Sequence, residues 1–411
     1  MKCRHCAAVL TLPFLDLGSA PPSNAYLTSA GLNAPETWYP LRVLVCTQCW
    51  LVQTEDHAGR DALFSADYAY FSSFSSSWLA HAQQYVQRIV QRLALDAASQ
   101  VVEIAANDGY LLQYVQHAGI PCYGVEPTAS TAAAARAKNI DIVARFFGLA
   151  LACELRAQGR QADLMVANNV LAHVPDINDF VAGFAELLKP GGVATFEFPH
   201  LLRMVQGCQF DTAYHEHYSY LSLTAVRRIF AANGLAVFDV ENLTTHGGSL
   251  RVFAQRADSG TRSGGAAVAA VLAREQAAGM GRATFYQGFQ AQAVRIKHAL
   301  LAFLLQARQD GLTVAAYGAA AKGNTLLNFA GVRPDLLAYV VDKNPAKQGQ
   351  YMPGSRVPIV DENHLRTRRP DRVLILPWNL RAEVVAQLDY IWQWGGRFVT
   401  AVPELEVGPG R

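Results

Sequence analysis

Apolar positions along the chain follow two periodicities, which predicts alternating strands and helices. Short apolar runs typical of buried strands lie at residues 101–105, 122–127, 162–168 and 193–198. Apolar residues recur at helical spacing in the predicted helices 77–95, 110–117 and 177–188. Strands and helices that alternate in this way form parallel sheets. The middle of the chain is therefore predicted to be an α/β unit, closed by an antiparallel pair of strands at 235–241 and 249–255.

The pattern changes at residues 258–265, which are polar and rich in glycine and predict a linker. Two helices, 267–277 and 283–309, are expected after it. A second α/β unit follows, with predicted strands at 313–317, 336–341, 372–376 and 398–402. A chain of 411 residues exceeds what one hydrophobic core usually serves, so several domains are expected.

Four of the seven cysteines form two Cys-x-x-Cys pairs: Cys3 with Cys6, and Cys46 with Cys49. Four thiolates suit a tetrahedral zinc ion in a closed structural site, with no open coordination position for catalysis. The segment between the pairs must form a small lobe, with strands near Phe14 and at residues 41–45. A disulfide pair is the alternative, and the cytoplasmic type of composition argues against it.

Charge and hydropathy exclude several classes of protein. The chain has 35 basic and 33 acidic residues, whereas nucleic-acid and anionic-membrane binders carry a concentrated basic excess. Basic residues gather only in short patches, such as residues 366–372. No apolar run reaches the roughly 18 residues of a membrane helix, and Pro13 and Asp16 interrupt the stretch that resembles a secretory signal. We expect a soluble, cytoplasmic, monomeric protein that binds neither nucleic acid nor membrane.

Polar residues follow the first two strands of the middle unit. The strand at 101–105 leads into a turn at 106–109, and Glu126 ends the next strand about twenty residues past the turn. This arrangement binds an adenosine through its ribose hydroxyls at the carboxyl edge of a parallel sheet. Acidic Glu103 and Asp108 beside the turn would repel a diphosphate, so the predicted ligand is an adenosine with a cationic or zwitterionic tail. A plain α/β sheet without cofactor is the alternative.

Three further polar segments could carry chemistry. The run Tyr-His-Glu-His-Tyr at 214–218 is either a site or an exposed turn, because unpaired polar groups cost a few kcal/mol to bury. His246, in a His-Gly-Gly-Ser turn, is placed to reach a ligand, or this is a plain hairpin turn. A small-residue turn at 318–324 with Lys322 begins a helix and forms either an anion site or a structural turn.

Taken in order, these motifs resemble one family, the S-adenosylmethionine-dependent sugar C-methyltransferases that methylate C-3 of dTDP-4-keto-6-deoxysugars. The resemblance rests on the two Cys-x-x-Cys pairs, residues 103–109, Glu126, residues 163–169, the 214–218 run, residues 246–249 and the 318–324 turn. It covers nearly the whole chain. It implies that the methyl donor is held by Glu103, Ala105, Asn107, Asp108, Gly109, Glu126, Asn168 and Asn169. Ala105 stands where the family commonly has glycine.

The implied fold class is α/β, in three domains. A small zinc-binding lobe occupies residues 1–65, and a class I S-adenosylmethionine methyltransferase core of Rossmann-like type occupies 66–257. A second Rossmann-like α/β domain, at 258–411, is expected to hold a nucleotide-diphosphate ketosugar together with the core. The substrate-binding residues expected there and at the hairpin turn are His246, Tyr317, Lys322 and Asn324.

The implied reaction needs a base, because a saturated sugar carbon beside a ketone becomes nucleophilic only when it loses a proton to form an enolate. His217 is expected to take that proton, since its ordinary pKa lies near 6.5. Tyr214 and Glu216 are expected to support it, and by resemblance Tyr70, Asn169 and His173 complete the pocket. His215 and Tyr218 are expected to be structural.

Two alternatives remain at this stage. A zinc-ribbon methyltransferase acting on RNA or protein should show a basic face, and the near-neutral charge argues against it. A non-catalytic protein that binds nucleotide sugars could keep the fold, but the intact Tyr-His-Glu-His run argues against that reading.

Overall fold

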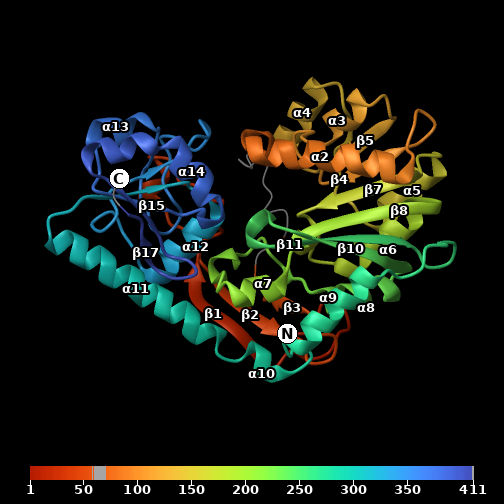
Figure 1. Cartoon of the computed structure of the whole chain (residues 1–411), viewed down its shortest axis with the longest axis horizontal. Coiled ribbons are helices and arrows are strands. Elements are labelled where there is room, and N and C mark those ends of the chain that lie inside the picture. Colours follow the sequence, from red (N-terminus) through yellow and green to blue (C-terminus); the bar gives the residue numbers. More distant parts are fainter. Residues whose placement is uncertain (58, 60–70, 410–411) are drawn as a thin grey trace.

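The computed structural model describes residues 1–57, 59 and 71–409. Figure 1 shows two α/β units side by side, with the strands β1 (Leu12–Ala20), β2 (Tyr39–Val45) and β3 (Val52–Thr54) at the base between them. Among the described residues, no helix combines the length and the apolar character needed to cross a membrane.

The amino-terminal sheet has the order β1-β2-β3-β9, and every pairing in it is antiparallel. Its fourth strand, β9 (Ser219–Tyr220), comes from the middle of the chain, directly after the 214–218 run. Buried side chains of the sheet pack on the carboxyl-terminal unit, and the Phe14 ring stacks on Phe289 with centroids 4.5 Å apart. The polar run is therefore tied at its end to the amino-terminal lobe.

The middle unit is built on a seven-stranded sheet with the order β10-β11-β8-β7-β4-β5-β6. Its strands are β4 (Val101–Ile104), β5 (Cys122–Val125), β6 (Asp141–Val143), β7 (Ala162–Asn168), β8 (Leu188–Pro199), β10 (Leu235–Leu243) and β11 (Ser249–Arg256). The pairs β4–β5, β4–β7, β5–β6 and β7–β8 are parallel, and β10 and β11 close the sheet as an antiparallel pair, as the hydrophobic pattern predicts.

Helices cover both faces of this sheet. One face carries α2 (Ser76–Leu93), α3 (Leu112–His117) and α4 (Ala129–Ala137); the other carries α5 (Leu149–Ala157), α6 (Ile177–Leu187), α8 (Leu223–Ala232) and α9 (Ala266–Ala277). Helix α2 begins where the Ser75 side chain accepts a hydrogen bond from the Trp78 backbone N–H, and it buries Ala82, Val86 and Ile89. Shorter segments are η1 (Gly31–Asn33), η2 (Ser72–Phe74), η3 (Leu171–His173), α7 (Leu201–Gln206), η4 (Phe210–Thr212) and η5 (Thr245–Gly247).

The carboxyl-terminal unit has a six-stranded sheet with the order β14-β13-β12-β15-β16-β17. Its strands are β12 (Val314–Tyr317), β13 (Val340–Val341), β14 (Ile359–Val360), β15 (Arg372–Ile375), β16 (Arg397–Thr400) and the antiparallel β17 (Glu406–Val407). Its helices are α10 (Ala283–Tyr286), α11 (Phe289–Gln309), α12 (Ala321–Ala330), α13 (Asn363–Arg368), η6 (Trp378–Leu380), α14 (Arg381–Gln387) and η7 (Asp389–Trp394).

Two predicted elements differ from the structure. The helix predicted at 283–309 is divided into α10 and α11, because Gly288 adopts a left-handed conformation with φ of 88°. The strand predicted at 336–341 is reduced to Val340–Val341, and Leu337 is buried in the core without strand pairing. The apolar run at 336–341 therefore indicated burial correctly, but only its last two residues form a strand.

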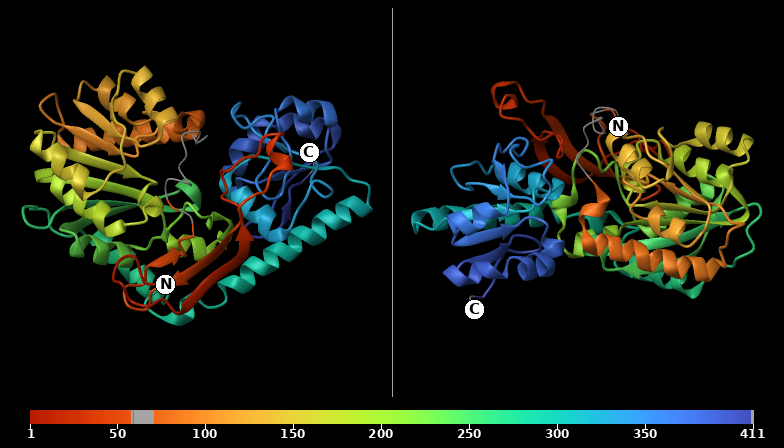
Figure 2. Two further views of the ribbon diagram at one scale, coloured as in Figure 1. Left: turned by 180° about the vertical axis from the view of Figure 1, so that it is seen from behind. Right: turned by 90° about the horizontal axis from the view of Figure 1, so that it is seen from above.

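A long loop joins the amino-terminal lobe to the carboxyl-terminal unit. Residues 21–38 connect β1 to β2, and Figure 2 shows this segment leaving the amino-terminal strands and lying against the carboxyl-terminal unit. The loop, the carboxyl ends of β4, β5 and β7, and the start of α12 all contribute to the lining of one cavity.

Candidate active site

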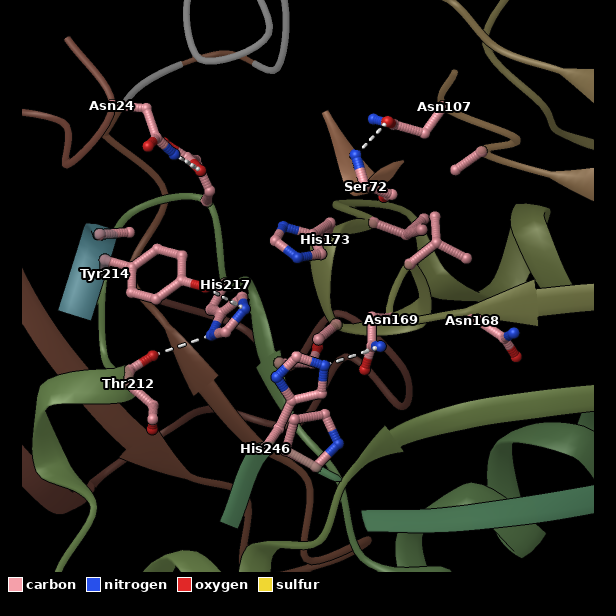
Figure 3. Close-up of a pocket in the computed structure, with 18 of the residues that line it drawn as sticks. Asn24, Ser72, Asn107, Asn168, Asn169, His173, Thr212, Tyr214, His217 and His246 are labelled. Carbon is pink, nitrogen blue, oxygen red and sulfur yellow. Dashed lines mark hydrogen bonds between the residues drawn. The ribbon is translucent and has the colours of Figure 1, made fainter. Parts of the chain in front are cut away.

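A cavity of about 420 Å³ lies where the three parts of the chain meet. Of the residues predicted for the site, those that line it are Ala105, Asn107, Glu126, Asn168, Asn169, His173, Tyr214, Glu216, His217, His246 and Lys322. The predicted residues outside its lining are Glu103, Asp108, Gly109, Tyr317 and Asn324. Tyr70, which the sequence placed beside the site, lies outside the described residues. Figure 3 shows His173, His217 and His246 around a common space, with Asn169 beside His246.

The first loop of the middle unit, residues 105–111 between β4 and α3, has an unusual backbone conformation. Ala105, Asn107 and Gly109 have φ of 57°, 49° and 75°, in the left-handed region that glycine adopts most easily. At Gly109 a side chain is also excluded by contact, because a Cβ would lie 2.3 Å from the Ile140 Cδ1 atom. The loop therefore takes the shape expected of a glycine-rich turn even though Ala105 replaces glycine.

Glu126 joins this loop to the end of β5. Its Oε2 accepts a hydrogen bond from the Asn107 backbone N–H at 2.9 Å, and its Oε1 accepts one from the Thr128 N–H at 2.9 Å. Burial raises the pKa of the Glu126 carboxyl, and these backbone donors oppose that rise. The carboxylate is thus fixed at the strand end, where it faces the cavity.

The two acids beside the turn support the loop from behind. Glu103 is fully buried, and desolvation raises its pKa well above the ordinary value, with Asp108 and Glu126 adding to the effect. Asp108 accepts a hydrogen bond from the Ser73 N–H at 3.2 Å and lies 3.9 Å from Lys138 Nζ. Because burial favours the neutral form of Glu103, it repels an anion less strongly than a full charge would.

Asn169 and His246 approach each other across the cavity. Nδ2 of Asn169 donates to Nε2 of His246 at 3.2 Å, and both residues have φ of 53°. Burial and the positive charge of Lys322 lower the pKa of His246 to about 4. The His246 turn is also held by Thr245, whose hydroxyl donates to Oε1 of the buried Glu197 at 2.9 Å. His246 is therefore a neutral, oriented imidazole at neutral pH.

His217 has one defined tautomer. Its Nδ1 lies 2.8 Å from the Thr212 carbonyl oxygen, which can only accept, so Nδ1 carries the proton (Figure 3). Its Nε2 therefore accepts a hydrogen bond from the Tyr214 hydroxyl at 2.7 Å. Burial lowers the pKa of His217 well below the ordinary value, and His173, Lys322 and His246 lower it further. The basic Nε2 lone pair thus faces a hydroxyl inside the cavity.

His173 packs beside this imidazole. The ring centroids of His173 and His217 lie 4.6 Å apart in an edge-to-face arrangement. Burial lowers the pKa of His173 to about 4, opposed by a hydrogen bond to the Glu216 backbone. Two neutral imidazoles therefore lie together, and neither adds a positive charge at neutral pH.

The carboxyl-terminal unit brings a cation to the same cavity. Lys322 Nζ donates to Asn379 Oδ1 at 2.7 Å and lies 4.6 Å from the centre of the Trp378 ring. The Trp378 indole N–H donates to Oδ2 of the buried Asp211 at 2.8 Å, across the two α/β units. Burial lowers the pKa of Lys322, and Asp211 opposes that effect. Helix α12 begins at Ala321, so its free backbone N–H groups lie at the same end of the cavity.

Two predicted substrate residues point elsewhere. Tyr317 belongs to the core on the α13 and α14 face of the sheet, and its hydroxyl accepts from Gln387 Nε2 at 2.9 Å. It alternates with Ala316, which faces the opposite core, because successive strand side chains point to opposite faces. Asn324 is fully buried and donates to the Ser23 carbonyl oxygen of the long loop.

Sequence reasoning missed Asn24, Thr212, Trp378 and Asn379, although the run containing Trp378 and Asn379 follows a predicted strand. Asn24 donates through Nδ2 to Glu216 Oε2 at 2.7 Å and lines the cavity. Thr212 acts through its backbone carbonyl, which no side-chain pattern reveals. In the 214–218 run His215, Glu216, His217 and Tyr218 are buried and Tyr214 is half-buried, so the run is not an exposed turn. His215 contacts the Tyr39 and Pro40 carbonyls, which agrees with a structural place.

The four cysteines of the two Cys-x-x-Cys pairs converge in the amino-terminal lobe. Their sulfur atoms all lie within 4.8 Å of one another, with Cys3 and Cys49 at 3.6 Å and Cys6 and Cys46 at 3.5 Å. Four thiolates bound to one zinc at about 2.3 Å have sulfur separations of about this size. The cluster fits a structural zinc ion with all four ligands supplied by the chain.

The end of the cavity formed by the first loop fits S-adenosylmethionine. A fixed carboxylate at the end of β5 is placed to accept from ribose hydroxyls, and the left-handed loop presents its backbone beside it. Asn168 and Asn169 end β7 at the same edge of the sheet. These residues would hold the cofactor, which supplies an electrophilic methyl group carried on a sulfonium sulfur.

Comparison with known proteins agrees with this arrangement. Three family models match successive parts of the chain: a zinc binding domain at residues 3–64, a methyltransferase domain at 78–240 and a C-methyltransferase C-terminal domain at 244–403. Among curated proteins, the C-methyltransferase NovU of Streptomyces niveus is 33% identical over 408 residues, which cover 99% of this chain and 96% of NovU.

Similar solved structures are more distant. Magnesium protoporphyrin IX methyltransferase of Synechocystis PCC 6803, solved with S-adenosylmethionine bound, is 18% identical over 44% of this chain and 82% of its own, with a TM-score of 0.33. A methyltransferase of Thermotoga maritima is 15% identical over 43% of this chain and 89% of its own, with a TM-score of 0.33. Scores this low support no further argument.

The match to NovU over nearly the full length and the three family models in order show that the chain belongs to the S-adenosylmethionine-dependent C-methyltransferases.

Proposed function

We propose that this C-methyltransferase acts on a nucleotide-linked 4-keto-deoxysugar, a dTDP-4-keto-6-deoxysugar methylated at C-3. The observation that carries the proposal is the buried Nε2 of His217, whose tautomer is fixed, inside a cavity that also reaches a methyl-donor loop and a cationic helix start. A neutral imidazole of this kind can remove a proton from carbon only if that carbon is acidified, as it is beside a ketone.

The chain's own groups account for the proton transfer. In the proposed reaction Nε2 of His217 takes the proton from C-3, and the two electrons of the C–H bond pass into the enolate. The imidazolium that results keeps its Nδ1–H bonded to the Thr212 carbonyl, which stabilises the positive charge. Before this step the Tyr214 hydroxyl must leave the Nε2 lone pair to which it donates, and it is then free to donate to a substrate oxygen.

The opposite end of the cavity suits the nucleotide diphosphate. Lys322 and Lys347 both line it, together with Ala320 and Ala321 at the start of α12. Ammonium groups and free backbone N–H groups at a helix amino terminus are the usual donors to phosphate oxygens. In this reading the sugar lies between the lysines and His217, and the amide of Asn169 and the ring of His246 lie on the methyl-donor side.

Methyl transfer from labelled S-adenosylmethionine tests the proposal directly. Purified protein is incubated with a panel of nucleotide-linked 4-ketosugars, with the matching 4-hydroxy sugars, with RNA and with a protein mixture. We expect label only in the ketosugars, and NMR of the product identifies the methylated carbon. Label in RNA or protein, or none in any ketosugar, contradicts the proposal. Exchange of the C-3 proton with deuterium in the presence of S-adenosylhomocysteine reports enolate formation separately from methyl transfer.

A further inference from the structure

The loop at residues 21–38 is fastened to the carboxyl-terminal unit along much of its length. Leu27 and Tyr351 exchange two backbone hydrogen bonds, at 3.0 and 2.8 Å. Farther along, Glu36 Oε1 accepts from the Gly354 N–H at 2.5 Å, and the Leu32 carbonyl accepts from Arg356 at 3.0 Å. Although the loop belongs to the amino-terminal lobe by chain order, the carboxyl-terminal unit sets its position.

The start of the loop is held beside the turn that leads into α12. The buried Asn324 donates to the Ser23 carbonyl, and the Tyr26 hydroxyl donates to the Ala319 carbonyl at 2.6 Å. Asn24 lies between these two anchors. Its backbone is therefore fixed on both sides, and its side chain lines the cavity (Figure 3).

The Asn24 side chain contacts the 214–218 run at Glu216. Its Nδ2 lies 2.7 Å from Oε2 of Glu216, which is 1% exposed. A carboxylate can only accept, so the amide nitrogen must face it, which fixes the amide orientation. Hydrogen bonds to a buried charged group are among the stronger ones, because a carboxylate out of water needs donors.

We propose that Asn24 is a positioning residue for methyl transfer: it holds the Glu216 carboxylate in place, so that the amino-terminal lobe takes part in the reaction through its loop. The middle unit supplies Glu216, the amino-terminal lobe supplies the donor, and the carboxyl-terminal unit holds the donor in place. The importance of Glu216 rests on the proposed function, because Glu216 is expected to support the proposed base His217, its neighbour in the chain.

The pair Asn24→Asp and Asn24→Ala separates positioning from simple packing. Asp has the shape of Asn but no donor, and it would place a second acid against Glu216. Positioning by the donor predicts that both variants lower kcat for methyl transfer by about tenfold to hundredfold, with Asn24→Asp at least as impaired as Asn24→Ala. A packing role predicts that Asn24→Asp stays near the wild type, and that result would refute the proposal.

Two further readouts and a control complete the test. The affinity for S-adenosylmethionine and the KM for the sugar should change little, whereas deuterium exchange at the substrate carbon should slow with kcat. In a Glu216→Gln background, Asn24→Ala should have little further effect, because the two residues act together. Asn33→Asp, the same change at an exposed asparagine of the same loop, is the matched control and should retain wild-type kcat.

The proposal can fail separately from the proposed function. If the wild type methylates a ketosugar and the Asn24 variants match it, the inference is wrong and the function stands. If the wild type methylates no ketosugar, the function is wrong, and crystal structures of the wild type and Asn24→Ala decide the inference. A Glu216 carboxylate displaced only in the variant supports positioning, and one that keeps its place in both contradicts it.

Discussion

The Tyr214 hydroxyl lies 2.7 Å from Nε2 of His217, three residues farther along the chain. Because the Thr212 carbonyl fixes the proton on Nδ1, the nitrogen that faces Tyr214 is the basic one. In this structure the Nε2 lone pair of His217 is occupied by the hydrogen bond from the Tyr214 hydroxyl. In the proposed reaction a substrate C–H must replace the phenol at Nε2 before proton transfer begins, which would couple substrate entry to the movement of one hydroxyl.

Replacing His217 by Asn should abolish most turnover while leaving the methyl donor bound. Loss of a general base costs about 10²- to 10⁴-fold in rate. His217 lies past the end of the sheet that carries Glu126, so affinity for S-adenosylmethionine should stay within about twofold of the wild type. A change of about twofold corresponds to a smaller free energy than the loss of one weak hydrogen bond. Labelled methyl transfer and calorimetric titration measure the two quantities. Undiminished methylation would remove His217 from the role of base.

Replacing Glu126 by Gln should have the opposite profile. An amide at this position offers only one acceptor oxygen, so Glu126→Gln cannot hold both the Asn107 and Thr128 N–H groups and also accept from a ribose. We expect affinity for S-adenosylmethionine to fall about tenfold to hundredfold, as for hydrogen bonds to a charged group. The KM for the sugar should change far less. Equal losses for both ligands would indicate that Glu126 supports the fold of the whole site.

The rate should persist to unusually low pH. Burial and the neighbouring His173, Lys322 and His246 lower the pKa of His217, so the imidazole stays unprotonated and active below its ordinary value of about 6.5. The acid limb of kcat/KM is therefore expected well below pH 6.5. In Lys322→Met the nearby positive charge is absent, and that limb should move to higher pH. A limb that stays in place would show that another group controls it.

Stability should fall as the pH is lowered from about 6.5 toward 4. In the unfolded chain His173 and His246 take up protons near their ordinary pKa of about 6.5, whereas in the fold their pKa values are about 4. Protons in this range therefore bind the unfolded state more strongly and favour it. Denaturant unfolding at pH 7 and pH 5 measures the change. His173→Asn should show a smaller loss than the wild type, and the exposed His298→Asn is the control.

Zinc should bind once per chain and be needed for the stability of the amino-terminal lobe. Structural zinc sites contribute folding free energy directly, so Cys46→Ser or chelation should lower the unfolding temperature and the metal content together. Because β3 pairs with β9 beside the 214–218 run, kcat should fall as well. Cys153→Ser, at an exposed cysteine outside the cluster, should change neither. A zinc-free variant with normal stability and kcat would contradict the structural role.

The alternating elements of both α/β units could be predicted because each carries its own periodicity. The strands β4, β5, β7, β10 and β11 and the helices α2, α3 and α6 lie within a few residues of the predicted ranges. Strand β8 begins five residues earlier than predicted, at Leu188, where it pairs with Ala162. The break at Gly288 and the short β13 depend on packing between units, which the local pattern does not contain.

The site was predictable where side-chain types cluster along the chain and unpredictable where distant segments meet. The residues of the 214–218 run that face the cavity, Tyr214, Glu216 and His217, stood out because polar groups so close together need partners. Asn24 is 192 positions from Glu216, in a stretch whose composition indicates only turns. Tyr317 was expected from the resemblance to bind substrate, and strand alternation directs its side chain into the core on the α13 and α14 face.

The pairing of Val52 with Tyr220 has a consequence for how the chain can be assembled and divided. During synthesis the amino-terminal lobe emerges first, yet its sheet stays one strand short until the middle unit has left the ribosome. The carboxyl-terminal segments that fasten residues 21–38 arrive later still. A fragment that ends after the middle unit would therefore lack the anchors of its own first loop, and a fragment that begins after the zinc lobe would leave β9 without a partner strand.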